Sequence, residues 1–185
     1  MKVLHVIPSV ARVRGGPSQA IFEMTKALKS KGVDVAIATT NDNGPSLLDG
    51  VPLNQEISYQ DIPTRFFPRL SSPVSSFREY TFSFDLTKWL WSNIENYDAV
   101  HVHALFSYPS TAAMTIAEKK KVPYLVRPGG HLCKWALQQG YSKKQKYLKT
   151  IGLRNLNQSS GIHFMTAQEE KEARALTISA STFIP

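Results

Sequence analysis

Short apolar segments alternate along this chain with longer segments in which apolar residues recur every three or four positions. The short segments are residues 2–8 (KVLHVIP), 33–40 (VDVAIATT), 98–104 (DAVHVHA) and 122–127 (VPYLVR). Such largely apolar runs are typical of strands that are covered on both faces of a parallel sheet. Residues 17–32 and 109–121 have helical spacing and begin with proline. The alternation predicts an α/β fold, a Rossmann-like doubly wound parallel sheet in three layers.

Residues 41–76 interrupt this alternation. They are rich in glycine, proline, serine and asparagine, which favours loops. Within them we expect a strand over residues 57–67, although Pro63 counts against a central place in a sheet. Residues 76–97 predict one helix, whose inward side chains are expected to be Tyr80, Phe84, Leu90 and Ile94.

The alternation resumes towards the end of the chain. The expected elements are a loop with a short helix over residues 128–140, a basic amphipathic helix over 143–160, and strands over 161–166 and 181–185. A helix over residues 166–176 begins with Thr166 and has Glu169 three residues later, the signature of a capping box. We therefore expect Glu169 and Glu170 to be cap and solvent-facing charges.

Composition narrows the class of protein. The 185 residues suit one domain over 1–185, and 22 basic against 14 acidic side chains give a net charge of +8. Plain solubility accounts for such an excess; among partners it favours anionic ones, namely nucleic acid, an anionic bilayer or a phosphorylated small molecule, and no nucleic-acid-binding module accompanies it. The single Cys133 excludes an internal disulfide and fits a cytoplasmic location. No stretch reaches the roughly 18 apolar residues of a membrane span.

The turn after the first predicted strand reads RVRGGPS. Gly15 and Gly16 allow close approach of the backbone to a ligand, the following helix provides a positive dipole end, and Arg14 adds charge. The order of residues matches neither the dinucleotide-binding fingerprint nor a Walker loop. On spacing alone, a phosphate-binding turn and a plain tight turn both remain open.

Two later loops also carry candidate side chains, since ligands of such sheets bind beyond the carboxyl ends of the strands. His101 and His103 lie on one side of a strand; we expect His101 in the core and His103 at a ligand. No carboxylate or cysteine stands at a helpful spacing from them, so we expect no metal site. In the loop RPGGHLCKW, the candidates for binding a substrate are Arg127, Gly129, Gly130, His131 and Trp135.

Other chemistries find no support in the sequence. No serine stands in a nucleophile-elbow context, and nothing marks Cys133 as reactive. The expected ligand-facing loops lack a pair of carboxylates for hydrolysis of a glycosidic bond. The basic helix carries Lys143, Lys144, Lys146, Lys149 and Arg154. It suits either a solvated face or peripheral contact with the inner face of an anionic membrane.

Three segments together resemble a known family. They are GGPSQAIFEMTKALKSKGVDVAIATT, YDAVHVHALFSYPSTAAMTIAEKKKVPYLVRPGGHLCKWAL and GIHFMTAQEEKEA. They look like the amino-terminal, acceptor-side half of the group 1 (family 4) GT-B glycosyltransferases. The resemblance covers most of the chain except residues 41–96.

The resemblance implies a role for each loop. Gly15 and Gly16, with Arg14 beside them, would approach the donor diphosphate, and the loop after VPYLVR would supply a histidine near the transferred sugar. Relatives commonly read Pro-His-Gly there, whereas this chain reads Pro-Gly-Gly-His, so His131 is the candidate catalytic residue. The implied donor is a UDP- or GDP-linked sugar, with no further cofactor, and the acceptor is a saccharide or lipid-linked glycan.

The family's second, nucleotide-sugar-binding domain has no counterpart in these residues. We therefore expect the amino-terminal half of a retaining transferase, inactive by itself. A stand-alone Rossmann-like module that binds an anionic ligand or partner is the alternative. Half of a GT-B epimerase is a third hypothesis, which would require carboxylates in the cleft.

Overall fold

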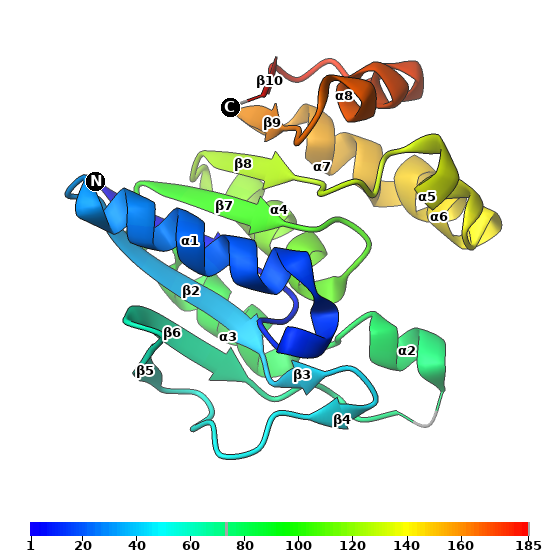
Figure 1. Ribbon diagram of the computed structural model, residues 1–185. Helices are drawn as coiled ribbons and strands as arrows, with labels where there is room; N and C mark the ends of the chain where they lie inside the picture. Colours follow the sequence, from blue (N-terminus) through cyan, green and yellow to red (C-terminus); the bar gives the residue numbers. More distant parts are fainter. Residues whose placement is uncertain (73, 185) are drawn as a thin grey trace.

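The computed structural model describes residues 1–72 and 74–184 and shows one mostly parallel sheet between helices (Figure 1). The sheet order is β10-β9-β8-β7-β1-β2-β6-β5, and β5 alone of these runs antiparallel to its neighbour. The eight strands of this sheet are β1 (Lys2–Val6), β2 (Asp34–Thr40), β5 (Glu56–Tyr59), β6 (Ile62–Phe67), β7 (Ala99–His103), β8 (Tyr124–Arg127), β9 (Gly161–His163) and β10 (Thr182–Phe183). The predicted doubly wound α/β fold is confirmed.

Helices cover both faces of the sheet. They are α1 (Gly16–Ser30), α2 (Ser75–Glu79), α3 (Phe84–Asn93), α4 (Tyr108–Lys120), α5 (Lys134–Gln138), α6 (Tyr141–Tyr147), α7 (Leu153–Asn157) and α8 (Ala167–Ala173), with short 3₁₀ turns η1 (Arg12–Arg14), η2 (Ile94–Asn96) and η4 (Arg174–Leu176). Ile21 and Phe22 of α1 pack on one face, against Ile37 of β2. Leu90 of α3 and Met114 of α4 are buried in the cluster on the opposite face. Figure 1 shows α1 in front of the sheet and α3 and α4 behind it.

The predicted helix over residues 76–97 is two helices. Thr81 takes a left-handed backbone conformation, with φ of 55°, which ends the helical path between α2 and α3. Ser83 then caps α3 by accepting a hydrogen bond from the N–H of Leu86. The break rotates the two halves relative to one another, so Phe84 is 63% exposed and the prediction of an inward side chain there is wrong.

The interrupting region over residues 41–76 holds more strand than its composition indicates. A small hairpin, β3 (Asp42–Asn43) with β4 (Ser46–Leu47), is followed by a second hairpin, β5 with β6, where one strand was expected. The turn at Gln60 and Asp61 has φ of 51° and 68°, the left-handed geometry of tight hairpin turns. Pro63 is tolerated because the pairing of β6 with β2 begins only at Thr64.

The predicted basic helix is confirmed, with one irregularity. A π-helical turn, η3 (Leu148–Gly152), joins α6 to α7. A Cβ atom at Gly152 would lie 2.7 Å from the ring of Tyr147, so this turn requires glycine. Across the described residues, no helix is both long enough and apolar enough to span a bilayer.

Candidate functional site

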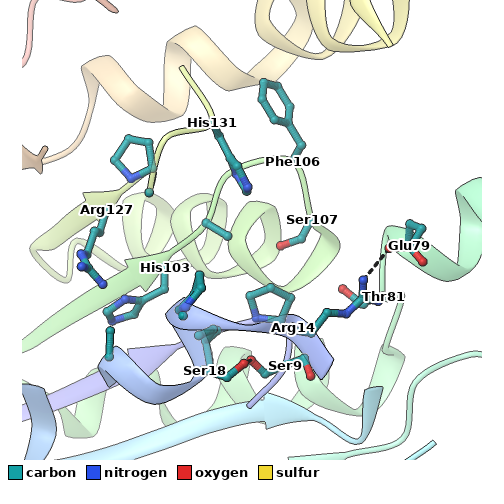
Figure 2. Close-up of a pocket in the computed structure, with 18 of the residues that line it drawn as sticks. Ser9, Arg14, Ser18, Glu79, Thr81, His103, Phe106, Ser107, Arg127 and His131 are labelled. Atoms are coloured by element: carbon teal, nitrogen blue, oxygen red, sulfur yellow. Dashed lines mark hydrogen bonds and ion pairs between the residues drawn. The ribbon is translucent and has the colours of Figure 1, made fainter. Parts of the chain in front are cut away.

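A cleft of about 620 Å³ lies at the carboxyl end of the sheet, where the loops after β1, β7, β8 and β9 meet (Figure 2). Its lining includes, from these loops and the helices beside them, Ser9, Arg14, Gly16, Ser18, Glu79, Thr81, His103, Phe106, Ser107, Arg127, Gly129, His131, Lys144 and Met165. Ligands of doubly wound sheets bind at this edge because loops and backbone donors converge there. The cleft is therefore the candidate site.

Two residues with a strained backbone line the cleft. Ala104, directly after β7, has φ of 66°, and Thr81 has φ of 55°, both in the left-handed region that costs a residue with a side chain about 1 kcal/mol or more. Gly129 has φ of 66°, which glycine adopts freely. All three residues line the cleft. The left-handed conformation at these positions turns the chain sharply where the loops meet the cleft.

The glycine turn after β1 leaves its backbone open. Gly15, with φ of 74°, precedes α1, and Gly16 begins the helix and lines the cleft. A Cβ atom built at either glycine would meet no atom within 4 Å. Gly15 itself lines a neighbouring depression of about 560 Å³, between Arg12 and Gln60. The amino end of α1 thus faces free space, and its dipole favours a negative charge there.

Arg14 reaches the cleft but is already held by two carboxylates. Its Nε and Nη2 donate to the two oxygens of Asp42, at 2.7 and 3.1 Å, and Nη1 donates to Glu79 at 2.6 Å. Asp42 is fully buried and also pairs with Arg69. The hydrogen bonds from Arg14 raise its pKa further, with Asp42 as the main cause. Arg14 therefore ties the glycine turn to the β3–β4 hairpin.

The loop after β8 is held by a buried carboxylate. Glu169 accepts hydrogen bonds from the N–H of Gly130 at 2.6 Å and from the N–H of Met165 at 3.3 Å. Its own N–H donates to Thr166, as in a capping box. Glu169 is only 1% exposed, so the prediction of a solvent-facing charge is wrong at this residue. Instead, Glu169 fixes the Arg127–His131 loop against α8.

The side chain of His131 points into the cleft (Figure 2). The N–H of Leu105 donates to its Nδ1 at 3.1 Å. A nitrogen that accepts a hydrogen bond carries no proton, so the neutral ring holds its proton on Nε2. Burial, with a smaller contribution from Lys144, lowers the pKa of His131 to about 4. At neutral pH His131 is thus a hydrogen-bond donor at Nε2.

A cluster of histidines lies at and below the floor of the cleft. Nδ1 of His5 and Nε2 of His103 are 3.0 Å apart, and His101 lies beside both rings. All three are buried, and burial is the main cause that lowers the pKa of each. Arg127 contributes to the lowered pKa of His101 and His103. These rings are therefore neutral at pH 7.

Positive charge enters the cleft from Arg127 and Lys144. Nε of Arg127 is buried and has no hydrogen-bond partner among residues 1–72 and 74–184. Nζ of Lys144 donates to the carbonyl of Ala136 at 2.6 Å and lies 5.0 Å from the centre of the Phe106 ring. Burial lowers the pKa of both groups, and desolvated cations of this kind bind anions strongly. The cleft suits a ligand with an anionic group.

The structure brings most of the residues proposed from the sequence to one place. Gly16, His103, Arg127, Gly129 and His131 all line the cleft. Gly15, Gly130 and Trp135 do not line it. The N–H of Gly130 donates to Glu169 instead. Trp135 lies on α5 with 73% of its surface exposed, so its ring does not contribute to the cleft lining.

Other lining residues were missed from the sequence. Ser107 follows β7 and caps α4 by accepting a hydrogen bond from the N–H of Ser110. A serine directly before a predicted helix is a typical N-cap, so the sequence did contain a signal for this residue. Lys144 was assigned only to a basic helix face. Glu79 and Thr81 come from the region where one helix was predicted, and their approach to the glycine turn has no local signal.

Comparisons with known proteins agree with this architecture. The chain is similar in structure to UDP-GlcNAc 2-epimerase from Neisseria meningitidis bound to UDP-GlcNAc, with a TM-score of 0.64 and 17% identity over 100% of this chain. It is similar to sucrose-phosphate synthase from Thermosynechococcus elongatus (TM-score 0.60, 13% identity, 100% of this chain and 87% of that one). It also resembles MurG from Acinetobacter baumannii (TM-score 0.54, 13% identity, covering 100% of this chain and 45% of that one).

At these identities the likeness shows the fold alone, a Rossmann-like unit of the GT-B type. The chain spans 45% of the length of the Neisseria epimerase. A comparison with curated proteins gives no match. The sequence model described as glycosyl transferase 4-like domain matches residues 15–185. Because this match includes the glycine turn and every later strand and helix, the chain belongs to the glycosyl transferase 4-like domain family.

Proposed function

We propose that this chain is the acceptor-binding domain of a retaining glycosyltransferase. The intact enzyme transfers a sugar from a UDP- or GDP-linked donor to a saccharide or lipid-linked glycan. One observation carries the proposal: in a domain of the glycosyl transferase 4-like family, Gly16, Arg127 and His131 line a single cleft at the carboxyl edge of the sheet. A second domain, which binds the nucleotide, completes the site.

The amino end of α1 contributes to stabilising the donor phosphate. As the sugar leaves, negative charge develops on the diphosphate, and preorganised donors and dipoles at that position lower the barrier. The N–H of Gly16 and the dipole of α1 meet this requirement, since nothing fills the space beside them. Arg14 acts as a positioning residue, because its donors are taken by Asp42 and Glu79.

His131 binds the transferred sugar through a hydroxyl group. Its Nε2 carries the proton, so it donates a hydrogen bond to a sugar oxygen and does not serve as a general base. Arg127 and Lys144 bind an anionic group of the acceptor. The epimerase hypothesis gains no support from the cleft, because Glu79, the carboxylate among its lining residues, is paired with Arg14.

Contact with an anionic membrane on its cytoplasmic side is a second part of the proposal. Lys143, Lys146 and Lys149 are exposed along α6 and the turn that follows it. Trp135 and Tyr141, nearby on α5 and α6, are 73% and 59% exposed. Exposed aromatic and basic side chains together suit the headgroup region of a bilayer. This surface would bring a lipid-linked acceptor to the cleft.

Binding and turnover by the chain alone test the proposal. We expect no transfer from UDP- or GDP-sugars, and weak binding of UDP and GDP in isothermal titration. In NMR titrations with saccharide phosphates, the amide signals of Gly16 and Gly129 should shift. Arg127→Gln should weaken this binding, whereas Arg154→Gln, on the far, exposed part of α7, serves as the matched control.

Three results would contradict it. Turnover by the isolated chain would remove the need for a second domain. Tight nucleotide binding by the chain alone would favour a stand-alone module that binds an anionic ligand. Saccharide-induced shifts confined to residues outside the cleft would place the acceptor elsewhere.

A further inference from the structure

Three histidines from two neighbouring strands converge beneath the cleft. His101 and His103 are two residues apart on β7, so their side chains lie on the same face of the sheet. His5 of β1 pairs in register with His101, which places its side chain on that face as well. A ring nitrogen from each of the three lies within 4.8 Å of the other two.

Hydrogen bonding leaves this cluster incomplete. The contact of 3.0 Å between His5 and His103 uses one nitrogen of each ring. Nε2 of His5 and Nε2 of His101 are buried, and neither has a hydrogen-bond partner among the described residues. A buried polar nitrogen without a partner costs about 1–3 kcal/mol. Two such nitrogens in one cluster of rings leave this part of the core with unused capacity to bind a ligand.

We propose that His5, His101 and His103 bind one divalent transition-metal ion of the zinc type. Three imidazoles are a known ligand set for zinc, and they leave a fourth position open. In tetrahedral zinc sites the ligand nitrogens are roughly 3.3 Å apart, given Zn–N bonds of about 2.0–2.1 Å. Rotation of the rings about χ2, a soft torsion, closes the spacing from the present limit of 4.8 Å.

The ligand atoms favour transition metals over Mg²⁺ and Ca²⁺. Among the described residues, no carboxylate contributes to the lowered pKa of His101 or His103. Hard cations such as Mg²⁺ and Ca²⁺ need oxygen ligands, which the three imidazoles do not supply, so this site disfavours them. Imidazole nitrogens suit zinc, copper, nickel and cobalt.

The cleft provides both the entry path and the fourth ligand. His103 lines the cleft, whereas His5 and His101 lie behind it, so the metal is reached from the cleft side. The fourth position is open to water from the cleft. This site does not depend on the proposed transferase function, because metal binding is measured without turnover.

The test uses the chain without a polyhistidine tag, stripped of metal with a chelator. We expect one Zn²⁺ per chain by mass spectrometry of the metal, and a visible absorption band of tetrahedral cobalt on titration with Co²⁺. Millimolar Mg²⁺ should not displace either ion. His101→Leu should weaken zinc binding by about 100-fold or more, since it removes a ligand outright.

His163→Gln is the matched control. The ring of His163 lies 5.6 Å from that of His101 and is buried on the same side of the sheet, but it is not one of the three. This variant should bind zinc as the wild type does. X-ray absorption of the zinc-loaded wild type should show three imidazole ligands, a result that does not require any variant to fold. Absence of stoichiometric zinc, a spectrum without imidazole, or equal loss of binding in His163→Gln would overturn the proposal.

Discussion

The two faces of β1 and β7 are built from alternate residues of the same strands, yet they differ completely in chemistry. On one face Leu4 and Val102 are fully buried in the larger apolar cluster beneath α3 and α4. On the other face His5, His101 and His103 are equally buried but leave two ring nitrogens without a partner among the described residues. Burial alone does not distinguish a residue that stabilises the fold from one that serves a ligand. The two unpartnered ring nitrogens make the histidine face the candidate for a ligand.

The largest expected effect lies on the apolar face. Leu4→Ala should lower the free energy of unfolding by about 2–5 kcal/mol, because it removes buried methyl groups and leaves a cavity. Urea denaturation measures the loss. Leu70→Ala, at a leucine that is 54% exposed, should stay within about 0.5 kcal/mol of the wild type. Equal effects at the two leucines would show that the apolar cluster is not the stabilising core.

A satisfied polar group should behave like the core. Glu169→Gln keeps the shape of the side chain but replaces a carboxylate oxygen, which accepts from Gly130 or Met165, with an NH₂ group. The change should cost about 1–3 kcal/mol, since a buried donor then faces another donor. Glu23→Gln, at an exposed position on α1, is the control. An unchanged free energy of unfolding in Glu169→Gln would show that the hydrogen bonds of this buried carboxylate do not stabilise the fold.

Acid should destabilise the cleft side of the sheet. The pKa of His131 is lowered to about 4 in the fold, against 6.5 unfolded, so between these values the unfolded chain binds more protons. Above pH 6.5 the ring is neutral in both states, and between pH 7 and pH 5 the fold loses roughly 2 kcal/mol because the unfolded chain binds the proton more readily. Denaturation curves at several pH values should show that the free energy of unfolding of His131→Gln falls less steeply with acid than that of the wild type. The same dependence in both proteins would contradict this assignment.

The smallest effect is expected on the histidine face. His101→Leu replaces a ring whose Nε2 has no partner among the described residues with an apolar side chain of similar size. At neutral pH and without metal, stability should change by less than about 1 kcal/mol or increase, since an unsatisfied buried nitrogen is removed. Thermal unfolding of the chelated protein provides the measurement. A loss as large as that of Leu4→Ala would mean that the imidazole supports the fold.

Much of the fold was predictable because its signals are local. The strands β1, β2, β7 and β8 are short apolar runs, and α1 and α4 have proline as their second residue. Residues 41–96 were harder. Composition indicated loops where two hairpins form, because the left-handed turns at Gln60 and Asp61 do not require glycine. The break at Thr81 has no local signal either, since it depends on the packing of α2 and α3 around it.

The candidate site was predictable where it depended on strand ends. Gly16, His103, Arg127 and His131 follow strands, and parallel strands bring their carboxyl ends to one edge. Glu169 was misassigned because its partner, Gly130, lies 39 residues away. Trp135 was placed at the substrate because its type suits sugars, but the direction of α5 turns it outward.

The sequence by itself determined the alternation of strands and helices, and with it the edge at which a ligand binds, since periodicity and helix ends depend on neighbours in the chain. Only the tertiary structure decided which polar groups meet there. His5 and His103 are 98 residues apart, and Arg14 meets a carboxylate 65 residues further on. Such contacts depend on strand order and loop path, which no local pattern contains.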